Sequence, residues 1–288
     1  MRFFVFPFLL LSAATSQAMP SSIWWPAWKI ESSEELSAPS GTGVKYRQKW
    51  DAPRYPLTYL FDGDIKTAWV YSALSSEFDS TIWKTRYGFR LTPTKPVTFD
   101  AIRIVNGQNI SPARFKANHR ANYVKITVSN GKIQRIHLRQ LADTQGWQTL
   151  KIPNFTAKTI TLEFPQIKQS SAKGADFCLS ELELRSLGRK IDWKMPKLVM
   201  YYNGLEGDAD PPLLVRRDGF PVDGIALDSG YSDRWSPSGR YVSGVAGAND
   251  RLWIYDAIKG TKISRTSPPT MISTDRQWLR QLSRLTSG

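Results

Sequence analysis

The sequence predicts an all-β protein built as a β-sandwich or jelly roll, and three observations support this. First, five short runs alternate apolar and polar residues with a period of two, which is typical of half-buried strands. These runs are 87–91, 102–104, 124–128, 160–164 and 182–184. Second, turn-forming pairs such as Asn106-Gly107 and Asn130-Gly131 lie between the runs. Third, no long helical pattern separates them, so antiparallel strands joined by turns are expected.

The first residues have the pattern of a secretory signal peptide. Arg2 supplies a positive charge, the stretch from Phe3 to Leu11 is apolar, and Ser16 and Ala18 are small residues at the cleavage positions. The apolar stretch is shorter than the roughly 20 residues of a membrane-spanning helix, and no second long apolar run follows. We therefore expect residues 1–18 to be removed, leaving an exported protein, periplasmic or secreted, without a transmembrane anchor.

Four segments are expected along the chain. Residues 1–18 are the signal peptide, and residues 19–50 are an extended lead-in in which Trp24, Trp25 and Trp28 are aromatic anchors. Residues 51–188 form the sandwich domain. Residues 189–288 form a further β segment that ends in a short helix, for which Thr274 to Leu285 is the best candidate.

Composition and charge narrow the function. The 288 residues are 41% hydrophobic and 22% charged, a globular balance that excludes a disordered chain and a multi-span membrane protein. The net charge is +14, and residues 19–190 hold 25 basic against 14 acidic residues. This basic character favours polyanions such as acidic glycans, with a surface charged only for solubility as the alternative. Nucleic acid is not expected, because the chain is exported and no basic run carries interleaved aromatics.

The motifs of common enzymes are absent from the sequence. There is no G-x-S-x-G elbow, H-E-x-x-H helix or phosphate-binding glycine loop. His119 and His137 are the only imidazoles, and Cys178, the single cysteine, is expected to be a small buried hydrophobe. Glu181 and Glu183 share one face of a strand and do not flank a cleft as glycosidase carboxylates do. A non-catalytic protein is therefore predicted.

Six segments, in this order, carry a resemblance to a known family. They are Leu57 to Trp69 (LTYLFDGDIKTAW), Asp100 to Gly107, Phe115 to Arg120, Val124 to Val128, Ile160 to Phe164, and Asp176 to Leu184. The set resembles the discoidin or coagulation-factor type C superfamily of galactose-binding-like jelly rolls. It is most similar to the glycan-binding discoidin-like module associated with bacterial NAD-glycohydrolase toxins. The resemblance implies a discoidin-like, NADase-type glycan-binding domain whose loops at one end contact the sugar.

Candidate ligand-binding residues follow partly from this resemblance, which implies Asn118 and Arg120. Sugars stack on aromatic faces and accept hydrogen bonds from planar polar groups, so side chains near the expected loops are added. The full set is Asn118, Arg120, Arg114, Tyr71, Trp83 and His119. Structural alternatives stay open, since Asn118 can satisfy backbone groups and Arg120 can pair with Asp62 or Asp64.

One loop has the composition of a calcium site. Asp62, Asp64 and Thr67 bring several oxygen atoms together, and the resemblance adds Glu181 from the closing strand as a fourth ligand. Calcium takes six to eight such oxygens. The alternative is a plain turn, capped by Asp62 and closed by Gly63. The loop can therefore be interpreted as a structural Ca²⁺ site or as a plain turn, and no other cofactor is expected.

The C-terminal segment has a separate resemblance. Residues 235–260 resemble one blade of a Tol-type or WD-like propeller, with a generic hairpin as the alternative. The chain after residue 190 has room for two blades at most, so a closed propeller cannot form from it. We expect a small β-meander of one or two blade-like units that packs on the sandwich.

The sequence therefore predicts an exported, non-catalytic carbohydrate-binding protein that recognises an envelope or cell-surface glycan, with acidic sugars favoured. Two alternatives remain. One is a protein-interaction or structural module of the bacterial envelope that binds its protein partner through residues 191–288. The other is a hydrolase of unknown type.

Overall fold

The fold is described from a computed structural model over residues 22–32, 55–71, 87–172, 175–202, 213–218, 221–226, 234–236, 238–246 and 251–266. These residues form eighteen strands, one short 3-10 helix and one short α-helix, so the expected all-β class is confirmed. The expected signal peptide, Trp83 and the expected C-terminal helix all lie outside the described residues.

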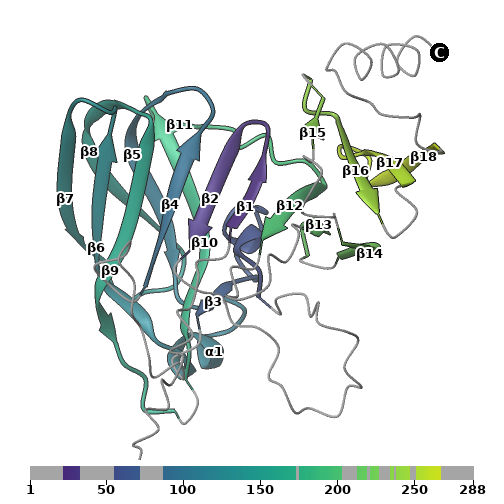
Figure 1. The fold of residues 1–288 in the computed structure, drawn as a ribbon. Coiled ribbons are helices and arrows are strands. Elements are labelled where there is room, and N and C mark those ends of the chain that lie inside the picture. Colours follow the sequence, from purple (N-terminus) through teal and green to yellow (C-terminus); the bar gives the residue numbers. More distant parts are fainter. Residues whose placement is uncertain are drawn as a thin grey trace, which may run out of the picture.

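Two antiparallel sheets form the sandwich (Figure 1). The first contains, side by side, β4 (Gly88–Pro93), β9 (Thr159–Lys168), β6 (Arg120–Ser129) and β7 (Gln134–Gln140). The second contains β11 (Arg189–Lys190), β10 (Phe177–Ser186), β5 (Val97–Asn106) and β8 (Trp147–Ala157), with β3 (Trp69–Tyr71) paired to β10. Each of the five alternating runs in the sequence lies in one of these strands or reaches one residue beyond it.

Alternation explains why these segments are strands with one buried face. In β6, Val124, Ile126 and Val128 are fully buried, while Lys125 and Thr127 between them are half-exposed. Such a period matches the pleat of a strand whose apolar side faces the opposite sheet.

The turn after β6 follows from local chemistry. The side-chain oxygen of Asn130 accepts hydrogen bonds from the backbone N–H groups of Lys132 and Ile133, at 2.9 and 2.8 Å. Gly131 has a φ of 90°, a left-handed value that glycine adopts readily. The Asn-Gly pair therefore reverses the chain into β7, as the sequence predicts.

Large aromatic residues fill the space between the sheets. Trp69 is fully buried, and its ring meets Phe89 and Phe177 edge-on with centroids 5.8 and 6.2 Å apart. Cys178 is buried as expected, and this burial raises the pKa of its thiol. The segment from Asp62 to Trp69 thus contributes a core tryptophan in addition to its polar loop.

The expected lead-in is partly a hairpin of the first sheet. β1 (Ser22–Trp25) pairs with β2 (Trp28–Ser32), and β2 pairs with β4. The physical reason is that Ile23, Trp25, Trp28 and Ile30 supply a buried face to the sandwich core. The indole N–H of Trp25 also donates to the carbonyl of Trp193 at 3.0 Å.

The first sheet continues past the expected domain boundary at residue 188. β12 (Leu198–Tyr202) pairs with β1, and β13 (Leu213–Arg216) and β14 (Pro221–Ala226) extend the sheet further. Segments that precede and follow the sandwich domain in the sequence therefore share its first sheet, and β12–β14 belong to that sheet.

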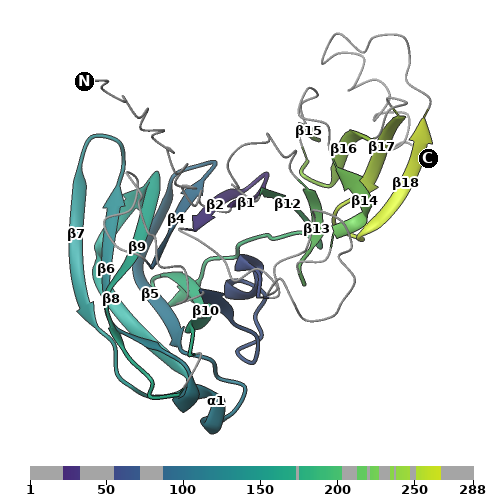
Figure 2. The same ribbon diagram turned by 60° about the horizontal axis from the view of Figure 1, so that its bottom comes forward.

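The remaining strands confirm the expected β-meander. β15 (Arg234–Trp235), β16 (Tyr241–Ala246), β17 (Arg251–Asp256) and β18 (Thr261–Thr266) pair in sequence order as a separate antiparallel sheet. It packs beside β12–β14, as Figures 1 and 2 show, through an apolar cluster. The buried members of this cluster are Leu198, Met200, Leu214, Val242, Tyr255 and Ala257. Among the helices of the described residues, none has the length and apolar composition needed to cross a membrane.

Candidate functional site

A short helix lies at one end of the sandwich, where β5 is connected to β6 (Figure 2). This helix, α1 (Pro112–Ala117), starts at Ser111, whose side chain accepts a hydrogen bond from the backbone N–H of Arg114. Pro112 occupies the first turn, where a missing N–H has no cost. The backbone of Asn118 is already extended, so the chain passes directly into β6. Three candidate residues, Asn118, His119 and Arg120, therefore follow one another at this end.

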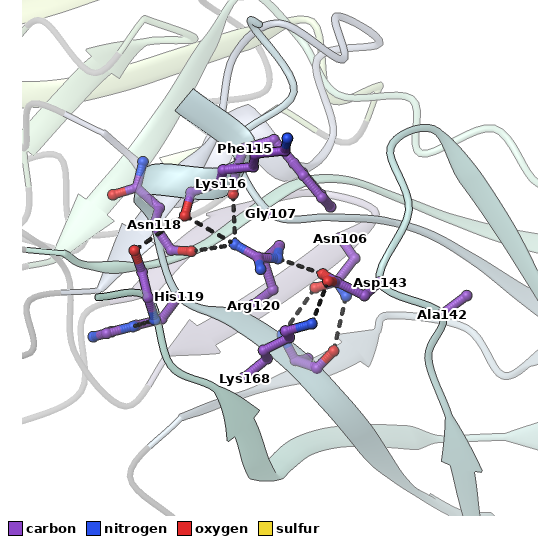
Figure 3. Close-up of polar contacts among 12 residues, drawn as sticks. Asn106, Gly107, Phe115, Lys116, Asn118, His119, Arg120, Ala142, Asp143 and Lys168 are labelled. Atoms are coloured by element: carbon purple, nitrogen blue, oxygen red, sulfur yellow. Dashed lines mark hydrogen bonds and ion pairs between the residues drawn. The ribbon is translucent and has the colours of Figure 1, made fainter. Parts of the chain in front are cut away.

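Arg120 is the centre of a buried polar network (Figure 3). Its side chain is only 6% exposed. Nη1 donates to the carbonyl oxygens of Phe115 and Asn118, at 2.6 and 2.7 Å, and the guanidinium lies 4.7 Å from the Phe115 ring centroid. Arg120 thus satisfies carbonyls at the end of α1 and fixes the path of the chain into β6.

Asp143 balances part of this charge. Its Oδ1 accepts from Nε of Arg120 at 2.5 Å, and its Oδ2 accepts from Nζ of Lys168 at 2.6 Å. The hydrogen bond from Arg120 is the main cause that holds the pKa of Asp143 below its usual range. The sequence left open a structural pairing of Arg120 with Asp62 or Asp64, whereas the structure gives it Asp143 as its ion-pair partner.

Asn118 and Arg114 are more accessible. Nδ2 of Asn118 donates to Oε1 of Gln108 at 2.8 Å and to the carbonyl of Arg114 at 3.1 Å. The Asn118 side chain is half-exposed, and that of Arg114 is exposed. Within the described residues, the Arg114 guanidinium forms no ion pair. Both residues therefore lie at the end of α1, where the Arg114 guanidinium can reach a ligand, while both Nδ2 hydrogens of Asn118 are already donated within the protein.

His119 is half-buried and acts as an acceptor. Its Nδ1 accepts a hydrogen bond from the backbone N–H of Ser170 at 2.8 Å. Burial lowers the pKa of His119, which favours the neutral ring that this bond requires. His119 therefore also holds the segment around Ser170 against the start of β6.

The two predicted aromatic residues do not contribute a described stacking surface here. Tyr71 is fully buried, with its ring edge-on to Tyr87 at 4.8 Å. It belongs to the core because β3 pairs with β10 through Tyr71 and Phe177. Trp83 lies outside the described residues.

Sequence reasoning placed Asn106 in a turn and in the family segment from Asp100 to Gly107, but did not include it among the site residues. This residue is fully buried at the end of β5. Its Nδ2 donates to the carbonyl of Ala121 at 2.8 Å, and its Oδ1 accepts from the N–H of Ala121 at 2.9 Å. Asn106 therefore joins the two sheets beside Arg120. The Asn-Gly pair gave a signal for a turn, but none for a contact with β6.

Gly107 allows close packing in the same place. Its φ is 74°, and a Cβ on it would lie 2.9 Å from Cγ of Arg120 and from the Phe115 ring. Both the backbone conformation and the close approach of these side chains therefore require glycine.

The predicted calcium loop is built around Asp62. The carboxylate of Asp62 accepts from the N–H of Asp64 at 2.8 Å and from the hydroxyl of Thr67 at 2.9 Å. The side chain of Asp64 instead accepts from the N–H of Lys66 at 2.9 Å and closes the turn. Burial raises the pKa of Asp62.

Glu181 reaches this loop from β10. Its Oε1 accepts from the N–H of Gly63 at 2.6 Å, while Oε2 is buried and receives no hydrogen bond from the described residues. Burial is the main cause that raises the pKa of Glu181 to about 8, and the negative charge of the nearby Asp62 acts in the same direction. The structure therefore brings Asp62 and Glu181 together, with Thr67 on Asp62.

Asp62 and Glu181 could bind a cation, but they supply only some of the ligands that a metal ion needs. The unsatisfied Oε2 of Glu181 needs either a proton, which it can share with Asp62, or a positive ion. No group of three or more His, Cys, Asp or Glu side chains close enough to hold a metal occurs within the described residues. Calcium would therefore take its other ligands from the Thr67 hydroxyl, backbone carbonyls and water.

A tryptophan-lined groove is a second feature that the sequence did not reveal. It lies beside the β1–β2 hairpin, has a volume of about 640 Å³, and has Trp24, Trp28 and Trp235 among its lining residues. Lys29 and Thr92 add polar groups to it. Because Trp235 comes from the C-terminal sheet, only the tertiary structure brings these indoles together.

The chain is similar to several solved structures at low sequence identity. No curated protein matches the chain. Among solved structures, the family 32 CBM from C. perfringens NanJ in complex with galactose is 13% identical, with 57% of this chain and 98% of that chain covered and a TM-score of 0.37. The CBM32-1 and CBM32-2 domains of Clostridium perfringens ZmpB in complex with GalNAc are 16% identical, with 57% and 35% covered and a TM-score of 0.38. CpGH89CBM32-5 from Clostridium perfringens, in complex with GalNAc-β-1,3-galactose, is 14% identical, with 55% and 95% covered and a TM-score of 0.35.

The family comparison covers the sandwich itself. The family described as NAD glycohydrolase translocation F5/8 type C domain matches residues 42–185, which is half of the chain. This range contains the Asp62 loop, α1, Arg120 and Glu181, and it agrees with the discoidin-like resemblance of the sequence. The chain therefore belongs to the NAD glycohydrolase translocation F5/8 type C domain family.

Proposed function

We propose that this chain binds glycan, without catalysing a reaction, at the end of the sandwich that carries α1. The main supporting observation is that the Arg114 guanidinium is exposed and forms no ion pair within the described residues, on a helix whose end is fixed by the buried Arg120 network. Groups held in place before binding lose less conformational freedom when a sugar docks. Family membership over residues 42–185 also supports a binding domain.

We propose that the preferred glycans are acidic. Arg114 and Lys116 are exposed basic residues on α1. The segment 19–190 carries 25 basic against 14 acidic residues. Guanidinium and ammonium groups bind carboxylated or sulfated sugars by charge-assisted hydrogen bonds. Binding is therefore expected to weaken as the salt concentration rises.

A glycan array of residues 19–288 tests the proposal, with the wild-type chain compared with Arg114→Ala and Lys95→Ala. Both substitutions remove one exposed cation, but Lys95 lies in the connection between β4 and β5. We expect a defined sugar class to bind, and only Arg114→Ala to lose it, with the melting temperature unchanged. A folded wild-type chain that binds no glycan would contradict the function.

The same array locates the site. Trp235→Ala removes one wall of the tryptophan groove, which offers indole faces for stacking on sugar rings. Loss of binding with Trp235→Ala alone would move the glycan site from the α1 end to this groove.

We further propose that the chain is exported through removal of residues 1–18. N-terminal sequencing of the protein recovered outside the cytoplasm tests this export.

We also propose that Asp62, Thr67 and Glu181 hold a structural Ca²⁺. The buried and unsatisfied Oε2 of Glu181 supports the ion. Asp64, whose side chain closes the turn, would contribute through its backbone carbonyl. Thermal unfolding with Ca²⁺ tests this site.

A further inference from the structure

β7 is an edge strand. It pairs with β6 along seven residue pairs, from Tyr123–Gln140 to Ser129–Gln134, and it ends the strand order of the first sheet. Figures 1 and 2 show it at the left margin with no described element on its far side. In such a strand, alternate backbone N–H and C=O groups point away from the sheet and can pair with another strand. On β7, the Leu138 carbonyl accepts a hydrogen bond from Nη1 of Arg139 at 3.0 Å, which an added strand would have to replace.

This edge also exposes aliphatic side chains. Ile136 and Leu138 are 60% and 56% exposed, and Ile133 in the preceding turn is 52% exposed. These are three of the seven large hydrophobic residues that are exposed within the described part of the chain. The pairing of Ile136 with Thr127, and of Leu138 with Lys125, places both on the outer face of the sheet. Their exposure therefore has no explanation in the packing of the sandwich core.

The charge of this edge is uncompensated. Lys132, Arg135 and Arg139 carry three positive charges, and no Asp or Glu occurs between Gly131 and Ala142. None of the three cations forms an ion pair within the described residues. On the neighbouring strand, by contrast, Lys125 pairs with Glu163 at 2.6 Å.

The arginines line the other face of the strand. Arg135 lies over the Phe155 ring at 5.1 Å, and Nε of Arg139 donates to the carbonyl of Lys151 at 3.3 Å. Burial and these two arginines lower the pKa of His137 between them. The edge therefore offers a row of aliphatic side chains on one face and a row of guanidinium groups on the other.

This pattern disfavours a second copy of the chain as the partner. Two β7 strands paired antiparallel about His137 would place Arg135 opposite Arg139 twice, and like charges directly opposite destabilise strand pairs. A strand with carboxylates on one face and aliphatic residues on the other would match both rows.

We propose that β7 docks an extended acidic segment of another polypeptide, which adds to the first sheet as a further strand. The backbone hydrogen bonds would provide affinity, and alternate apolar and acidic side chains would provide specificity. This site lies on a different strand from the proposed glycan site and does not depend on it.

The first test uses a fluorescent peptide that alternates Val and Glu, with a Val/Lys peptide and a proline-containing Val/Glu peptide as controls. We expect the Val/Glu peptide to bind and to slow hydrogen exchange at the backbone amides of 133–139. Neither control should bind. Equal binding of the proline-containing peptide would overturn strand addition, because proline cannot complete the backbone pairing.

Substitutions then measure how much the aliphatic side chains and the guanidinium groups of β7 each contribute to peptide binding. We expect two double variants to lower the affinity for the Val/Glu peptide by about tenfold or more each. One is Arg135→Glu with Arg139→Glu, and the other is Ile136→Ser with Leu138→Ser. Lys95→Glu, an exposed charge reversal between β4 and β5, should change affinity little. The melting temperature of each variant confirms folding.

Two further outcomes would overturn the proposal. Equal affinity for a heparin fragment, lost with the arginine variant but retained by Ile136→Ser with Leu138→Ser, would identify a general polyanion site. Self-association in sedimentation, lost with the same serine variant, would identify a second copy as the occupant.

Discussion

Nε of Arg120 lies 2.5 Å from Oδ1 of Asp143, and this ion pair joins the start of β6 to the loop before β8. Arg120 is nearly fully buried, while the Asp143 side chain is 36% exposed. The pair therefore anchors a surface loop to a buried cation, beside the residues proposed to contact glycan.

Arg120→Met should reduce the free energy of unfolding by about 2–4 kcal/mol, because it leaves the carbonyls of Phe115 and Asn118 without a donor, at roughly 1–3 kcal/mol for each buried unsatisfied group. Urea denaturation measures this loss. Arg114→Met on the same helix is the control and should stay within about 0.5 kcal/mol, since its side chain is exposed. A stable Arg120→Met variant that has lost only glycan binding would instead make Arg120 a ligand residue.

Asn106→Asp should cost about 3 kcal/mol of unfolding free energy. The substitution replaces the Nδ2 donor to Ala121 with a buried oxygen that faces a carbonyl. Asn154→Asp, at an exposed position of β8, is the matched control and should have little effect. Equal urea midpoints for the two variants would show that Asn106 does not join the sheets.

Calcium should raise the melting temperature of the wild-type chain by roughly 5–10 °C when it is present at about a hundred times its dissociation constant. Glu181→Gln should abolish this rise, whereas Asp192→Asn, an exposed turn aspartate, should retain it. The rise should be larger at pH 8 than at pH 6, because protons compete for a carboxyl group whose pKa is about 8. A wild-type melting temperature that calcium leaves unchanged would favour the proton shared by Asp62 and Glu181.

Stability should depend on pH through His119. Burial lowers its pKa in the folded state, so the unfolded chain binds the proton more readily. This contribution to stability is complete above the unfolded pKa of about 6.5 and is lost as the pH falls through the lower folded value. His119→Asn keeps an acceptor for the Ser170 N–H but cannot titrate, so its melting temperature should fall less between pH 7 and pH 5. Parallel curves for both proteins would refute this role of His119.

The sequence alone predicted the strands of the sandwich well. Runs such as Val124 to Val128 and Ile160 to Phe164 indicate which face of the strand is buried, because successive side chains of a strand point to opposite faces of the sheet. The Asn130-Gly131 turn was equally local. The sequence also brought the Asp62 loop to Glu181 through a family pattern.

Other features depend on contacts between distant segments, which leave no periodic signal. Asn106 joins Ala121 across the two sheets, and Asp143 reaches Arg120 from another loop. The N-terminal hairpin enters the first sheet because its apolar face completes the core and β12 supplies its second neighbour. Trp24 and Trp235 line one groove because the tertiary structure brings together two segments that are distant in the sequence.

The sequence by itself thus determined the all-β class, the strand faces, the turns and the order of the family segments, since each depends on neighbouring residues. Only the tertiary structure decided which polar side chains are buried in pairs, as with Arg120, and which remain accessible, as with Arg114. It also decided that β7 is an edge. Strand order and burial are fixed by packing among segments far apart in the chain, and no local pattern encodes that packing.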